Sequence, residues 1–118
     1  MLVVATRWRE TFGLVTLEAV MSGLPVLVSR HALIAPDVVD LGCAEICDPD
    51  RPDAMALILS RLSKDDQRVQ AMSEAGFEHG RQLAPTPQVW CEALIAIYGK
   101  KLAGYSAAPR MATQLIAS

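Results

Sequence analysis

The segment TFGLVTLEAVMSGLPVLVS, residues 11–29, is the part of this chain most informative about its fold class. Glu18 is its only charged residue, and the turn Gly23-Leu24-Pro25 divides it into two apolar elements. The segment is long enough to raise the possibility of a membrane helix. A soluble helix, turn and strand is the better interpretation, because the turn interrupts the segment and a carboxylate at its centre is costly in lipid.

The first of these elements is predicted to be a helix and the second a buried strand. We expect the helix to begin at Phe12 with Thr11 as its cap, and to stop at Ser22-Gly23. The strand is expected over Pro25–Ser29, and the apolar run Leu2–Ala5, which contains two β-branched valines, suits another strand buried on both faces. Strand, helix and strand within about thirty residues match one βαβ unit with a parallel sheet.

The rest of the chain is predicted to be mostly helical. Thr86-Pro87 provides an N-cap and a proline at the first helical position, and we expect Trp90 and Tyr98 to face the core. One apolar stripe with the helical period consists of Met55, Ile58, Leu59 and Leu62. The expected elements are a helix at 35–41, a strand at 43–47, a helix introduced by Asp50 and Pro52, a helix at about 65–82, and a helix from Pro87. The predicted fold is α/β, with a partial Rossmann-like parallel sheet and a helical C-terminal segment within residues 1–103, followed by a flexible tail over 104–118.

The composition of the chain limits the classes of function that it can have. The 118 residues suit one domain, and the net charge of −2 with scattered basic residues argues against a nucleic-acid partner. Cys43, Cys47 and Cys91 are odd in number and lack a nearby histidine pair, so we interpret them as reduced thiols of a cytoplasmic protein. The apolar run before Arg7 is too short for a signal peptide.

Two glutamates bracket the expected start of the helix. Ionised carboxylates are rarely buried without a partner, so Glu18 on an otherwise uncharged helix needs an explanation. An intramolecular salt bridge, or a helix edge that reaches solvent, would explain it. Glu10 suggests a third explanation, because a helix N-terminus between two carboxylates can hold the diphosphate of a nucleotide sugar. Gly13 would let that ligand approach the backbone, and Glu18 would lie roughly 9 Å along the axis, at the ribose.

Weaker candidates lie nearby. Arg7 and Arg9 could approach a donor phosphate, although arginines beside a loop are more often solvated. His31 follows the second strand and therefore lies on the ligand side of a parallel sheet, where a solvent-facing histidine is also common.

The pattern E-x-F-G-L-x-x-x-E-A followed by S-G-L-P-V, residues 10–26, resembles the Glu-x7-Glu block of retaining glycosyltransferases of the GT-B fold, group 1 type. The similarity covers about 100 residues and is most specific in the first thirty. It implies that Glu10 contacts donor-sugar hydroxyls in the catalytic site and that Glu18 holds the ribose hydroxyls. The backbone amides of Phe12, Gly13 and Leu14 would meet the sugar and diphosphate.

The resemblance also implies a function for the intact enzyme. That function is transfer of a hexose, with retention, from a UDP- or GDP-sugar to a glycan or a lipid-linked acceptor, in polysaccharide biosynthesis. No cofactor or metal is implied, because the helix end and basic side chains would stabilise the leaving group.

The chain departs from the family pattern in two places. After the second strand, family members often carry Gly-Gly and then an acidic residue, where this chain has Arg30–Asp37. The resemblance also implies an N-terminal acceptor-binding domain and a basic pair for the diphosphate, which these 118 residues do not match. We therefore expect the 118 residues to act as an inactive fragment that can self-associate through an exposed sheet edge. A non-catalytic nucleotide-binding or structural remnant is the alternative, and a GT-B-like nucleotide-sugar epimerase is a third interpretation.

Overall fold

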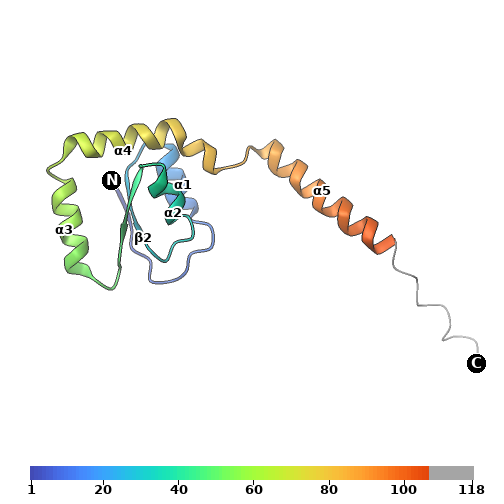
Figure 1. The fold of residues 1–118 in the computed structure, drawn as a ribbon, viewed down its shortest axis with the longest axis horizontal. Coiled ribbons are helices and arrows are strands. Elements are labelled where there is room, and N and C mark those ends of the chain that lie inside the picture. Colours follow the sequence, from blue (N-terminus) through green and yellow to red (C-terminus); the bar gives the residue numbers. More distant parts are fainter. Residues whose placement is uncertain (107–118) are drawn as a thin grey trace, which may run out of the picture. The chain divides into compact units, whose positions relative to one another are not determined.

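The computed structural model describes residues 1–106 and divides the chain into a unit at Met1–Ala84 and a second that begins at Pro85. Strands and helices alternate through the first half of the first unit, and helices follow (Figure 1). The strands are β1 (Leu2–Val4), β2 (Val26–Ser29) and β3 (Ala44–Cys47). The helices are α1 (Leu14–Met21), α2 (Ala35–Asp40), α3 (Pro52–Leu62), α4 (Asp66–His79), a short 3₁₀ helix η1 (Gly80–Leu83) and α5 (Pro87–Ser106).

The three strands form one parallel sheet in the order β1-β2-β3. Leu2 pairs with Val26, and Val26 pairs with Ala44 on its other side. All four residues of β2 are buried, as expected for an apolar run that occupies the middle of a parallel sheet. The α/β class with a partial Rossmann-like sheet is therefore confirmed.

The expected burial of the first strand on both faces is wrong. β1 is an outer strand of the described sheet, and the side chain of Val3 is 42% exposed. Apolar composition did not distinguish a central strand from an outer one, because both positions accept β-branched residues.

The expected start of the first helix is also wrong. α1 begins at Leu14, and its N-cap is Gly13 rather than Thr11, with no side-chain cap hydrogen bond. Gly13 has a φ of 72° and is buried, and its carbonyl accepts the first helical hydrogen bond from the Leu17 N–H at 2.9 Å. A left-handed residue cannot continue a right-handed helix, so Phe12 lies outside it.

α4 lies against α1 (Figure 1), and two glycines, Gly76 in α4 and Gly80 in η1, allow a close approach to α1. A Cβ atom at Gly76 would lie 2.8 Å from the Val20 carbonyl oxygen, and one at Gly80 would lie 2.8 Å from a Val20 methyl carbon. The hydroxyl of Ser73 donates a hydrogen bond to the Gly23 carbonyl at 2.6 Å. These contacts hold α4 on α1 and on the turn into β2.

The core of the first unit lies between the sheet and the helices that cover it. Val20, Val26, Val28, Val38 and Cys43 belong to its cluster of buried residues. Burial raises the pKa of the Cys43 thiol, whose sulfur donates to the Val38 carbonyl at 3.0 Å. The three cysteines are free thiols, as expected.

The second unit consists, among the described residues, of α5 and the segment that leads into it. Its start is as expected, since the Thr86 hydroxyl accepts a hydrogen bond from the Val89 N–H at 3.3 Å. Taken by itself, this unit leaves Trp90 and Tyr98 exposed, and the prediction that they face the core stays a prediction. α5 continues to Ser106, past the expected tail boundary at residue 103, and residues 107–118 of that tail lie outside the described range.

Along residues 1–106, no helix has the length and apolarity that crossing a membrane requires.

Candidate functional site

Loops that follow the strands meet at the carboxyl edge of the sheet and are joined by backbone contacts. The hydroxyl of Ser29 donates to the Thr6 carbonyl at 2.7 Å and accepts from the His31 N–H at 3.2 Å. The Leu33 N–H donates to the Glu10 carbonyl at 3.2 Å. The loop after β1 is therefore fixed to the loop after β2, at the edge where ligands bind in open parallel sheets.

Glu10 lies in the loop between β1 and α1, and its side chain is only partly exposed. One of its carboxylate oxygens, Oε2, is buried and has no hydrogen-bond partner among the described residues. A buried polar atom without a partner carries a desolvation cost. A ligand hydroxyl that donates to Oε2 would remove this cost.

Gly13 joins this loop to α1, and the fold requires a glycine at this position. A Cβ atom there would lie 2.7 Å from the Ile34 Cγ2 atom, and the φ of 72° disfavours any side chain. Ile34 occupies the space on the Cβ side of Gly13, and the expectation that a ligand approaches the Gly13 backbone stays a prediction. The α1 N-terminus still carries no side-chain cap, so its first N–H groups are available to an acceptor.

Glu18 is exposed on α1 and forms no ion pair with any side chain within residues 1–106. The described residues therefore contain no salt bridge to Glu18, and its helix edge reaches solvent. An exposed carboxylate is also accessible to a ligand, so the ribose role stays a prediction. Because α1 starts at Leu14, Glu18 lies one turn beyond it on the same face, about 6 Å along the axis rather than 9 Å. Phe12 and Leu14 are exposed beside the α1 N-terminus.

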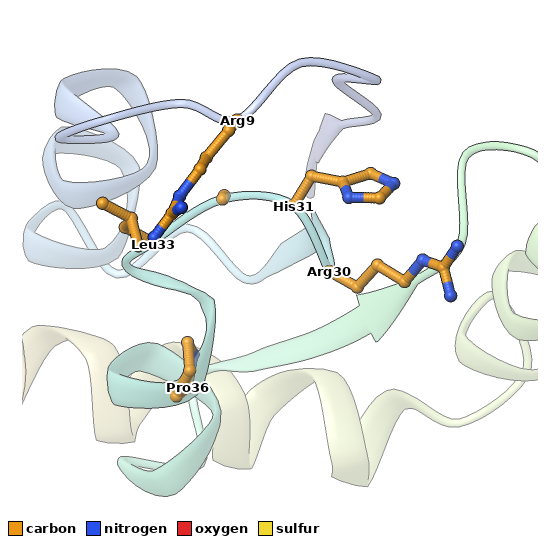
Figure 2. A pocket seen from close by; sticks show the side chains of 6 residues that line it. Arg9, Arg30, His31, Leu33 and Pro36 are labelled. Atoms are coloured by element: carbon orange, nitrogen blue, oxygen red, sulfur yellow. The ribbon is translucent and has the colours of Figure 1, made fainter.

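An open pocket of about 350 Å³ lies between the two joined loops (Figure 2). Arg9 comes from the loop after β1, and its side chain reaches across to the loop after β2, close to Leu33 in Figure 2. Arg30 and His31 line the pocket from the second loop and point toward the side of β3. Its lining residues are Arg9, Arg30, His31, Ala32, Leu33 and Pro36.

Ion pairs connect these loops to the segment after β3. The Arg7 side chain lies 3.3 Å from an Asp50 oxygen, and that of Arg30 lies 3.4 Å from an Asp48 oxygen. His31, Asp48 and Asp50 bring one potential metal-ligand atom each within 4.8 Å of the others. Both carboxylates already have an arginine partner, so the group is explained as part of an ion-pair network. No sequence pattern indicated this network, because its members are distant along the chain.

Comparison with known proteins identifies the family. A sequence model described as glycosyl transferases group 1 matches residues 1–79. The chain belongs to the group 1 glycosyltransferases. A D-inositol 3-phosphate glycosyltransferase of Corynebacterium diphtheriae is 35% identical over 92 residues, which cover 78% of this chain and 21% of the relative. Proteins with the same name match from Corynebacterium glutamicum, at 34% over 80 residues (68% and 19% of the two chains), and from Segniliparus rotundus, at 28% over 105 residues (89% and 23%). No solved structure gives a significant match.

This group 1 glycosyltransferase chain thus spans about a fifth of the length of the curated relatives it matches. The family match covers the sheet, the joined loops and α1 to α4. The individual roles of Glu10, Phe12, Gly13, Leu14 and Glu18 stay predictions.

Proposed function

We propose that the carboxyl edge of this sheet binds a nucleotide-sugar donor, a UDP- or GDP-sugar. The diphosphate lies at the uncapped N-terminus of α1, where free N–H groups and the helix dipole favour an anion. Glu18 accepts hydrogen bonds from the ribose hydroxyls, and Glu10 accepts them from the sugar. The observation that carries this proposal is the placement of two carboxylates around an uncapped helix end. Among residues 1–106, one of them is exposed and has no ion pair, and the other has a buried oxygen with no hydrogen-bond partner.

In the intact enzyme the proposed reaction is transfer of a hexose with retention at the anomeric carbon. The bond from that carbon to the diphosphate oxygen breaks, and a bond to an acceptor oxygen forms as the acceptor hydroxyl passes its proton to the leaving diphosphate oxygen. The α1 N-terminus stabilises the charge that develops on the leaving diphosphate, and the proposal needs no metal there.

We also propose the class of the acceptor that receives the sugar. A glycan or a lipid-linked sugar, in cytoplasmic polysaccharide biosynthesis, suits the family resemblance, and the name of the relatives adds phosphorylated inositol as a candidate. Because the chain spans about a fifth of those relatives, we propose that it binds the donor and requires an acceptor-binding domain for transfer.

The test replaces Glu18 by Gln and measures UDP and GDP binding by calorimetry together with thermal unfolding. Loss of charge-assisted hydrogen bonds to the ribose should weaken binding of the preferred nucleotide by about ten- to a hundredfold. Thermal stability should stay unchanged, because Glu18 is exposed and the part of the chain that the structure describes contains no ion pair that its neutralisation would break.

Glu10→Gln is the matched comparison within the same site. Since Glu10 is assigned to the sugar, this variant should bind the nucleotide diphosphate nearly as well as the unmodified chain. Equal nucleotide affinity of the unmodified chain and Glu18→Gln would remove the ribose assignment. An absence of binding of both nucleotides by the unmodified chain would contradict the donor site itself.

A further inference from the structure

Arg9 differs from the other two arginines at this edge of the sheet. Arg7, two residues earlier on the same loop, is paired with Asp50, and Arg30 on the neighbouring loop is paired with Asp48. Within the part of the chain that the structure describes, no carboxylate lies within ion-pair distance of Arg9. Its guanidinium therefore keeps its full capacity to donate to an anion.

The surroundings of Arg9 favour an anion over a cation. The pocket that it lines has two arginines, one histidine and no carboxylate among its lining residues. Asp48 balances Arg30 only, so the pocket keeps a positive charge from Arg9. The hydrogen bond from Leu33 to the Glu10 carbonyl joins the wall of this pocket to the backbone of Glu10, the residue that we assign to the sugar.

We propose that this pocket is a phosphate-binding subsite, with Arg9 as its principal donor. The inference rests on the proposed function, which places a phosphorylated substrate at this edge of the sheet. A planar guanidinium binds two phosphate oxygens at once, which fixes orientation as well as adding attraction. The phosphate belongs to the donor diphosphate or to a phosphorylated acceptor, and both present the same oxygens to Arg9.

The experiment compares Arg9→Gln with Arg7→Gln in the full 118-residue chain. Both variants remove one exposed arginine from the same loop, so a general loss of positive charge affects them alike. Inorganic pyrophosphate is the first probe, because it has neither ribose nor sugar and its binding does not depend on Glu18 or Glu10. We expect Arg9→Gln to raise the Kd for pyrophosphate about tenfold or more, and Arg7→Gln to change it less than about twofold.

Further probes identify the source of the phosphate. If the Kd for UDP or GDP rises in Arg9→Gln, the subsite takes the donor diphosphate. If the Kd for D-inositol 3-phosphate rises instead, it takes a phosphorylated acceptor. Arg9→Lys keeps the charge but not the two-point contact, so it should bind each probe with intermediate affinity.

Several results would overturn the subsite. The unmodified chain could fail to bind pyrophosphate, Arg9→Gln and Arg7→Gln could lose affinity for pyrophosphate equally, or Arg9→Gln could lose none. Each of these results would contradict the subsite. The proposed function fails separately, when the nucleotides do not bind or when Glu18→Gln binds them normally. If Arg9→Gln unfolds at a lower temperature than Arg7→Gln, the test uses Arg9→Lys in its place. Pyrophosphate binding by Arg9→Lys that equals binding by the unmodified chain would then contradict the subsite.

Discussion

Gly13 illustrates how one residue fixes the geometry of the whole candidate site. It ends the loop that carries Glu10 and sets the first turn of α1, in which Glu18 follows one turn later. Its φ of 72° and its contact with Ile34 both exclude a side chain. The distance between the two glutamates therefore depends on a backbone conformation that few residues other than glycine adopt at low cost.

Gly13→Ala should destabilise the chain by about 2 to 4 kcal/mol, measured by denaturant unfolding. About 1 to 2 kcal/mol of this comes from the left-handed conformation, and the rest comes from displacing Ile34. Gly42→Ala is the control, since Gly42 has a φ of 78° but no atom within 4 Å of the position that a Cβ atom would take. It should cost only the conformational part, so equal losses in the two variants would contradict the steric role of Ile34.

At the scale of elements, the contact between α1 and α4 holds the helix of the candidate site in place. Gly76 lets the two helices approach until a methyl group would meet the Val20 carbonyl oxygen, which is part of the α1 backbone. A backbone atom cannot rotate away as a flexible side chain does. α4 therefore restrains α1, although a glycine in the interior of a helix by itself lowers the stability of that helix.

Gly76→Ala should lower the free energy of unfolding by about 1 to 2 kcal/mol, despite the better helix propensity of alanine. Gly99→Ala in α5 is the matched control, because nothing lies within 4 Å of its Cβ position. There the propensity gain is unopposed, and the helix should become more stable by up to about 1 kcal/mol. A stabilising effect of Gly76→Ala in thermal unfolding would show that the two helices lie further apart than described.

For the whole molecule, the described sheet has outer strands on both sides. β1 and β3 each pair on one side only, and Val3 and Ile46 on them are exposed. Unpaired backbone groups next to apolar side chains favour pairing with a second chain.

The chain should therefore self-associate as its concentration rises, measured by sedimentation velocity. Val3→Lys should reduce association, because a charge on an outer strand opposes edge pairing. Leu57→Lys removes a more exposed apolar side chain from α3, away from the sheet edge, and should leave association unchanged. A monomer at all concentrations, or equal effects of the two lysines, would argue against association through β1.

The fold class, the order of the elements and the family could all be predicted from the sequence. Local patterns suffice for these, because apolar runs, caps and the turn at Gly23 act on neighbours along the chain. Tertiary contacts were needed to establish the position of β1 at the outside of the sheet, the start of α1 at Leu14, and the solvent exposure of Glu18. They alone revealed Arg9 in its pocket and the ion pairs of Asp48 and Asp50. These features depend on contacts between loops that follow different strands. Local sequence patterns do not indicate which loops come into contact, because the loops are distant along the chain.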